Sequence, residues 1–121
     1  MTLLLRALWE MARYDALSKA LGFGGVRRSM KPPRSREAAP STIEAVCEAV
    51  GCVSSFYWKP LLCLQRSIVT ARLLRFLGIS AEVVIGYRAQ PFFSHAWVEV
   101  GGRVVNDSSA YQTKLQILDR F

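Results

Sequence analysis

The sequence predicts an α+β fold in which helices come first and a small antiparallel sheet follows. Three stretches before Gly78 carry apolar residues at helical spacing, whereas β-branched residues dominate the segment directly after it. A Gly101-Gly102 pair then separates two short stretches of strand-like sequence, which is the pattern of a β-hairpin. The chain has 121 residues, the size of one domain, so we expect a single unit with helical residues 1–57 and a core of residues 58–121.

Composition and charge limit the class of protein. Hydrophobic residues make up 51% of the chain, and 16 Lys and Arg against 9 Asp and Glu give a net charge of +7, which excludes a disordered or collagen-like chain. The mean hydropathy of +0.19 is high for a small domain and indicates apolar surface meant for a partner. No apolar run reaches the roughly 20 residues of a membrane span, and no signal peptide is recognisable. The odd number of cysteines, three, precludes a complete disulfide framework, so we expect a cytoplasmic protein.

Residues 3–21 form the first predicted helix. Arg6, Glu10 and Arg13 fall on one stripe at helical spacing, and most of the remaining surface is apolar. This apolar arc is wider than one buried face requires. The helix is therefore either buried within its own domain or also docks a partner protein. The glycines that follow are expected to end it.

Residues 26–40 form a predicted linker with basic side chains around Pro32-Pro33. Such a cluster can contact nucleic acid, but interleaved aromatic residues, a zinc pattern and helix-turn-helix spacing are all missing. We favour a solvated loop over a docking strip for an acidic partner, and we expect no nucleic-acid binding.

Two further helices are predicted before the strands. A capping box at residues 41–44 begins a helix that runs to about Val50. Pro60 begins the next, since proline prefers the first helical turn, and this helix runs to about Leu77, with Gly78 as its end. Its core stripe comprises Leu64, Ile68, Ala71 and Leu74, and the arginines at 66, 72 and 75 are expected to face elsewhere.

Two of the cysteines lie near the second helix. The spacing of Cys47 and Cys52 is not that of a usual zinc pair, and no second pair exists. We therefore expect both to be small buried hydrophobic residues, and we expect no metal or cofactor.

The strands follow Gly78. Residues 81–87 are rich in β-branched side chains, Pro91 interrupts the chain, and residues 94–100 alternate in polarity before a partner stretch at 103–106. The tail, residues 108–121, fits a short helix or a strand.

Cys63, His95 and Asp107 are candidates for a nucleophile, a general base and a group that orients the base. Cys63 falls in the first turn of the third helix, where unpaired N–H groups favour a thiolate and can stabilise an oxyanion. His95, the only histidine, opens the first hairpin strand, and Asp107 closes the second. Each also has a purely structural interpretation, as a core cysteine, a strand histidine and a turn-capping aspartate.

The hairpin register decides whether His95 and Asp107 share a face. A two-residue turn at Gly101-Gly102 places His95 opposite Ser108 and turns Asp107 to the other face of the sheet. A three-residue loop that begins at Val100 places His95 opposite Asp107, and it needs the second glycine in the left-handed conformation. The triad hypothesis therefore predicts the three-residue loop with a positive φ at that glycine.

Residues 58–107 carry blocks in a specific order. Residues 58–67 contain P-x-x-C-L-x-R-S, and residues 73–81 contain L-L-R-x-x-G-I-x-A. Residues 84–88 and 91–100 continue the order, which ends at Asn106-Asp107. These blocks resemble the lasso-peptide maturation proteases, whereas the first 40 residues share only their hydrophobic helical character with that family.

The resemblance implies a transglutaminase/papain-like α+β core and a cysteine peptidase that removes the leader from a ribosomally made precursor peptide. The family's catalytic residues fall on Cys63, His95 and Asp107. In this family the leader-recognition domain is either fused ahead of the protease or a separate small protein. Because residues 1–57 are predicted as helices and linker, the resemblance implies a stand-alone protease with a separate leader-recognition protein. An ATP-dependent macrolactam synthetase would act afterwards.

Several alternatives stay open at this point. Trp58 is either an oxyanion donor or a core aromatic residue. The same triad can pass its acyl group to an amine, as transglutaminases do, and a non-catalytic module can bind a peptide or nucleic acid through the basic linker. The surplus of apolar residues is interpreted as a docking surface for the leader-recognition protein.

Overall fold

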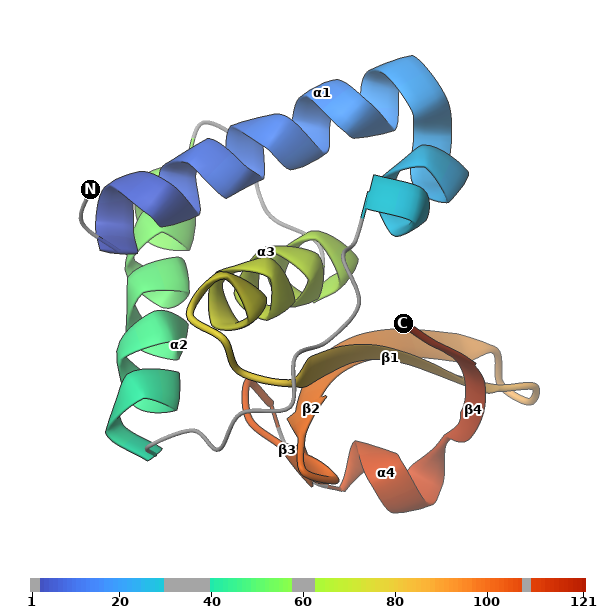
Figure 1. The fold of residues 1–121 in the computed structure, drawn as a ribbon. Helices are drawn as coiled ribbons and strands as arrows, with labels where there is room; N and C mark the ends of the chain where they lie inside the picture. Colours follow the sequence, from blue (N-terminus) through green and yellow to red (C-terminus); the bar gives the residue numbers. More distant parts are fainter. Residues whose placement is uncertain (1–2, 30–39, 58–62, 108–109) are drawn as a thin grey trace.

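The computed structural model describes residues 3–29, 40–57, 63–107 and 110–121 (Figure 1). Helix α3 lies on one face of a four-stranded antiparallel sheet, with α1 and α2 packed around it, and the short helix α4 lies on the opposite face. The predicted α+β class is therefore confirmed. The elements in chain order are α1 (Leu3–Ser29), α2 (Pro40–Phe56), α3 (Cys63–Phe76), β1 (Ala81–Arg88), β2 (Phe93–Val100), β3 (Arg103–Val104), α4 (Tyr111–Lys114) and β4 (Gln116–Arg120).

Most of helix α3 is buried, because α1, α2 and the sheet pack around it. The expectation that its arginines avoid the core is wrong for Arg72 and Arg75, which are 8% and 7% exposed. Each is accommodated by a polar partner: Arg72 Nη1 lies 3.3 Å from a carboxylate oxygen of Glu10, and Arg75 Nε donates to the Ala81 carbonyl at 2.8 Å. Such partners offset part of the cost of burying a charged group.

The end of α3 follows the sequence prediction. Gly78 has φ +85°, and its N–H donates to the Arg75 carbonyl at 3.0 Å. Ile79 N–H donates to the Leu74 carbonyl at 2.9 Å, which completes a Schellman cap. The predicted start at Pro60 lies outside the described residues.

The first two helices are longer than predicted. Gly22 has non-helical angles, φ +70° and ψ −169°, yet the chain resumes a helix and continues to Ser29. The first residues of the expected linker, 26–29, therefore belong to α1, and residues 30–39 lie outside the described part of the chain. Helix α2 likewise continues past Val50 to Phe56. Within the described ranges, no helix has the length and apolar character needed to cross a membrane.

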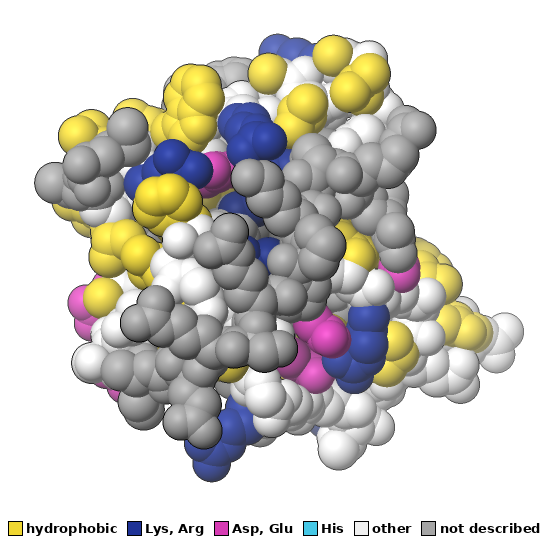
Figure 2. Space-filling view, viewed as in Figure 1, with side chains coloured by type: hydrophobic (Ala, Val, Ile, Leu, Met, Phe, Trp, Pro, Cys, Tyr) yellow, Lys and Arg dark blue, Asp and Glu magenta, His cyan; other side chains and the backbone are white. Residues whose placement is uncertain are grey.

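Helix α1 buries one carboxylate of its charged stripe and leaves several apolar side chains at the surface. Glu10 is 2% exposed and lies 3.2 Å from Arg6 and 3.9 Å from Arg13. The large apolar side chains left about half exposed include Leu4, Leu5, Leu8 and Trp9 near the start of α1, and Leu21 further along. Figure 2 shows hydrophobic and basic side chains next to one another over this part of the molecule. The first alternative, that α1 is buried entirely within its own domain, is therefore wrong.

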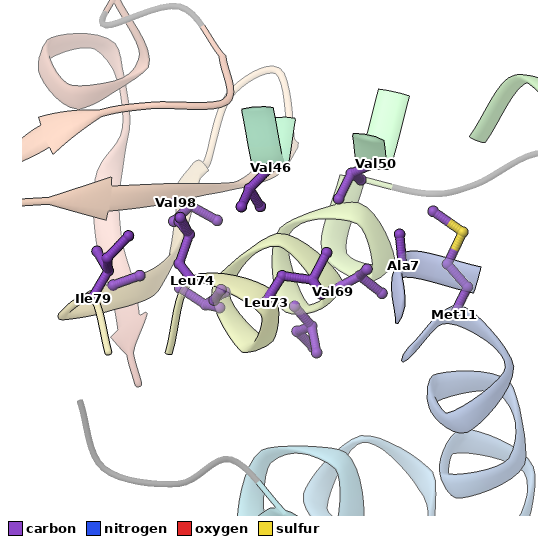
Figure 3. Packing of buried hydrophobic residues seen from close by; sticks show 13 residues of the cluster. Ala7, Met11, Val46, Val50, Val69, Leu73, Leu74, Ile79 and Val98 are labelled. Atoms are coloured by element: carbon purple, nitrogen blue, oxygen red, sulfur yellow. The ribbon is translucent and has the colours of Figure 1, made fainter. Parts of the chain in front are cut away.

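The main core forms where α1, α2 and the sheet meet α3. Figure 3 shows side chains of α3 between those of the two other helices and the strands. Its labelled members are Ala7 and Met11 of α1, Val46 and Val50 of α2, Val69, Leu73 and Leu74 of α3, and Ile79 and Val98.

The strands lie in the order β3-β2-β1-β4. Alternate residues face opposite sides, so Val83 and Val98 join the main core. Val84 and Trp97 face the other side and pack with Leu115, which follows α4. The ambiguous tail thus forms both a short helix, which covers the second face of the sheet, and an edge strand, which pairs with β1.

Candidate active site

His95 and Asp107 are in direct contact. His95 Nε2 lies 2.6 Å from Asp107 Oδ2, and the two side chains are 16% and 34% exposed. An ionised carboxylate can only accept, so Nε2 must carry the proton of this bond. The neutral imidazole then has its lone pair on Nδ1, where a general base needs it. The pairing predicted between these two residues is therefore present.

The hairpin that brings them together differs from the predicted one. Val100 pairs with Arg103 and Glu99 with Val104, so the turn contains only Gly101 and Gly102. Both glycines have positive φ, +59° and +79°, as a two-residue turn of type I′ requires. The positive φ expected at Gly102 is present, but the three-residue loop is wrong.

Asp107 reaches His95 because the strand pairing stops early. Val105 N–H donates to the Val98 carbonyl at 3.0 Å, but the return bond is missing: Val98 N–H donates instead to Asn106 Oδ1 at 2.8 Å. Residues 105–107 consequently leave the regular ladder, and the register argument no longer governs the direction of Asp107.

Asn106 also contacts the central helix. Its Nδ2 donates to Ser67 Oγ, 3.3 Å away, and Ser67 is fully buried. The Asn106 amide therefore connects β2, the loop that carries Asp107, and α3. The sequence indicated this residue only as the neighbour of Asp107, because nothing local reveals which distant N–H it serves.

Aromatic rings surround the His95 imidazole. Phe93 and Trp97 lie beside it on the same face of β2, with ring centroids 6.1 and 6.4 Å from that of His95. The Tyr111 ring of α4 is nearer, with a centroid distance of 4.2 Å and a tilt of 33°. Sequence reasoning did not identify Tyr111, because the tail gave no clear pattern.

Cys63 is the first residue of α3, and its side chain is half-buried. Helix α3 packs on β2, the strand that carries His95. No hydrogen bond within the described residues joins Cys63 to His95, so the nucleophile–base contact stays a prediction. Trp58, the candidate oxyanion donor, lies outside the described residues.

The Cys63 end of α3 is held against α1. Gln65 Nε2 donates to the Met11 carbonyl at 3.4 Å and to Asp15 Oδ1 at 3.3 Å. The Tyr57 hydroxyl donates to the other oxygen of Asp15. These bonds fix the helix end that carries the candidate nucleophile.

One phenol of α1 lies within the electrostatic reach of Cys63. Burial, and then the negative charges of Asp15 and of the Cys63 thiolate, raise the pKa of Tyr14 above its usual value. The phenol of Tyr14 therefore favours its protonated form.

The other two cysteines differ from each other. Cys47 is half-buried, burial raises the pKa of its thiol, and its Sγ lies 3.5 Å from the Val105 carbonyl oxygen. Cys52 is exposed, so its predicted burial is wrong. Among the residues that the structure describes, no three His, Cys, Asp or Glu side chains gather in a metal-binding arrangement.

A buried carboxylate supports the second face of the sheet. Glu99, 4% exposed, accepts from Trp97 Nε1 at 2.8 Å and from Arg120 Nη1 at 2.9 Å. Burial alone would raise the pKa of Glu99, but the hydrogen bonds from Trp97, Arg120 and Gln112 lower it below its usual value. Glu99 thereby links β2 to β4 and α4.

Comparison with known proteins agrees with this architecture. A relative from Escherichia coli, the microcin J25-processing protein McjB, is 48% identical over 56 residues. This stretch is 46% of the present chain and 27% of the relative, so the similarity spans about a quarter of the relative's length. No solved structure matches the chain. The model of the transglutaminase-like superfamily matches residues 1–119, nearly the whole chain, and the protein therefore belongs to that superfamily.

Proposed function

We propose that this protein is a cysteine peptidase that removes the leader peptide from the precursor of a lasso peptide. Cys63 is the nucleophile, His95 the base, and Asp107 the group that orients it. The observation that carries this proposal is the 2.6 Å contact between His95 Nε2 and Asp107 Oδ2, which leaves Nδ1 for the nucleophile. The processing protein McjB, and the resemblance of residues 58–107 to lasso-peptide maturation proteases, support the substrate class.

The geometry supports a two-step reaction. His95 Nδ1 takes the proton of Cys63, and the thiolate attacks the carbonyl carbon of the last leader residue. The unpaired N–H groups at the start of α3 stabilise the resulting oxyanion. The His95 imidazolium then gives its proton to the departing amine of the core peptide, which leaves the leader as a thioester on Cys63.

Water completes the cycle. His95 Nδ1 takes a proton from water, whose oxygen attacks the thioester carbon, and the thiolate leaves. The leader departs with a new carboxylate, and His95 and Cys63 return to their starting state. Throughout, Asp107 accepts from Nε2–H and so maintains the imidazole tautomer. These steps use side chains, backbone N–H groups and water, and no cofactor.

The precursor would be presented by a separate leader-recognition protein. The half-exposed leucines and Trp9 on the outer face of α1 support an apolar docking surface for it. An ATP-dependent macrolactam synthetase would close the ring after cleavage, in the cytoplasm.

The docking surface is tested by placing a charge on it. Trp9→Glu should slow cleavage at low partner concentration, and excess partner should restore it, because only docking is weakened. Leu118→Glu is the matched control, since Leu118 is 64% exposed on β4, which lies away from α1 (Figure 1). Equal rates for both variants would exclude this surface.

The catalytic proposal is tested by mass spectrometry of the precursor with its leader-recognition protein. Wild-type protein and Cys52→Ser should release the leader, whereas Cys63→Ala should not. Continued leader release by Cys63→Ala would overturn the proposal. Cys52 is a suitable control because it is exposed and lies on α2.

Membership of the transglutaminase-like superfamily favours one second candidate, transfer of the acyl group from Cys63 to an amine instead of water. The same assay with an added primary amine separates the two activities. A leader with the mass of a free acid supports hydrolysis, and a leader that carries the amine supports transfer.

A further inference from the structure

On β2 the His95 imidazole lies between the rings of Phe93 and Trp97, and the ring of Tyr111 packs over this row. Phe93, His95 and Trp97 alternate along β2 and share a face of the sheet. The Tyr111 ring lies against all three, with centroid distances of 4.2 Å to His95, 6.3 Å to Phe93 and 6.2 Å to Trp97. Tyr111 is thus the one residue of α4 in ring contact with the candidate base.

Contacts of two residues that follow Tyr111 in the chain determine its position. The next residue, Gln112, donates from Nε2 to the Gly102 carbonyl at 2.9 Å. Leu115, 7% exposed, packs with Val84 and Trp97 on the same face of the sheet. Because both anchors belong to the sheet or its hairpin, the ring is held over β2 although α4 has only four residues.

We propose that Tyr111 is a positioning residue for His95, an inference that rests on the proposed peptidase function. The bond to Asp107 restrains the imidazole at one atom, Nε2, and leaves the ring able to rock about that atom. A ring packed on its face restrains this second motion. Together the two contacts hold Nδ1 in a single direction.

The contact also has an electrostatic consequence. The face of an aromatic ring carries negative charge density and attracts a cation placed over it. Tyr111 therefore stabilises the imidazolium form of His95 more than the neutral form. That form accompanies the Cys63 thiolate, so the loss of the ring should reduce the fraction of thiolate.

The ring of Tyr111, and not its hydroxyl, carries this role. The hydroxyl forms no hydrogen bond with another described residue. Tyr111→Phe should therefore retain the wild-type behaviour, and Tyr111→Leu should lose it. Phe56→Leu is the matched control, an exposed aromatic residue on α2 replaced in the same way.

The test measures alkylation of Cys63 by iodoacetamide across pH, with peptide mass mapping to separate it from exposed Cys52 in the same molecules. Only the thiolate reacts. At about pH 6, where an ordinary thiol is almost fully protonated, Tyr111→Leu should lower the Cys63 rate by about threefold to tenfold. Tyr111→Phe and Phe56→Leu should match the wild type, and the rate of Cys52 should stay constant.

Two outcomes separate this inference from the proposed function. If His95→Ala slows Cys63 alkylation while Tyr111→Leu does not, Tyr111 has no positioning role and the triad stands. If His95→Ala leaves the rate unchanged, Cys63 and His95 are not coupled, and both proposals fall.

Proton NMR of the wild-type protein tests the contact between Tyr111 and His95 without any substitution. The chain has one histidine, so its imidazole gives one set of proton resonances. A ring 4.2 Å away should displace these resonances upfield relative to a free histidine. Resonances at free-histidine positions would show that Tyr111 does not cover His95 in solution.

Discussion

The backbone N–H of Val98 donates to the side-chain oxygen of Asn106, 2.8 Å away, at the point where a regular hairpin would use the carbonyl of Val105. This change of acceptor ends the regular hydrogen bonding between β2 and β3 two residues before Asp107. The side chain that ends the ladder is also the one that contacts Ser67 of α3. Asn106 therefore determines both where the strand stops and how the Asp107 loop lies against the helix.

Replacement of Asn106 should affect stability and the site together. In Asn106→Ala, the Val98 N–H loses its acceptor, which should lower the free energy of unfolding by about 1–3 kcal/mol. Urea unfolding measures this loss, and the rate of precursor cleavage should fall as Asp107 loses its placement. Asn106→Asp keeps an acceptor oxygen and should retain more stability than the alanine variant. Equal stability of Asn106→Ala and the wild type would contradict the role assigned to this bond.

Gly86 should not tolerate a side chain. It pairs with His95 on one side and Ile117 on the other, and a Cβ there would lie 2.7 Å from Trp97 Cη2 and 2.9 Å from Leu115 Cβ. Gly86→Ala should therefore cost about 1–3 kcal/mol in unfolding free energy.

The matched control for this substitution is Gly51→Ala in α2, where a Cβ meets nothing within 4 Å. There the lower backbone entropy of alanine should stabilise the helix by up to about 1 kcal/mol. If both variants unfold at the same urea concentration, close packing around Gly86 is excluded.

The Glu99 carboxylate should make the protein sensitive to acid. Hydrogen bonds from Trp97, Arg120 and Gln112 outweigh the effect of burial and lower the pKa of Glu99 in the folded state. A lowered folded-state pKa stabilises the fold above the pKa of the unfolded chain, about 4.3, and this contribution is lost as pH falls through the folded value.

Glu99→Gln tests the sign of this effect. The wild type should be more stable than the variant near neutral pH, and the difference should shrink as pH falls below about 4. Unfolding free energies measured by urea at several pH values follow the trend. A difference that stays constant through the acid range would show that Glu99 does not titrate in this manner.

Removing only one partner of the Glu10–Arg72 ion pair should lower the unfolding free energy strongly. Arg72 is buried, and burial followed by the charge of Arg13 lowers the pKa of Arg72, while Glu10 opposes both. Glu10→Gln removes the compensating charge and should lower the unfolding free energy by about 3–5 kcal/mol.

An exposed pair is the comparison. Glu82 lies 3.2 Å from Arg120, and both side chains are almost half exposed. Glu82→Gln should cost less than about 1 kcal/mol, because water screens the pair. Similar losses from Glu10→Gln and Glu82→Gln would mean that burial does not govern the Glu10 pair.

Local signals in the chain were enough for the order of the first three helices and the strands that follow them, but not for α4 and β4. Gly78 ends α3 as expected, because only a residue that readily adopts positive φ suits the Schellman cap. The alternating residues of β2 likewise placed His95 on a strand, and the blocks around Cys63 and His95 indicated the superfamily.

Contacts between residues far apart in the chain decided the rest. Arg72 is buried because Glu10, sixty-two positions away, neutralises it, and no pattern within α3 contains that information. Asp107 reaches His95 because an Asn106 side chain replaces a backbone acceptor and ends the ladder, which the turn residues do not specify. Tyr111 covers His95 because the sheet holds α4 in place. Helical and strand periodicity are local properties of the backbone, whereas buried charges, ladder ends and ring contacts depend on which distant groups satisfy one another.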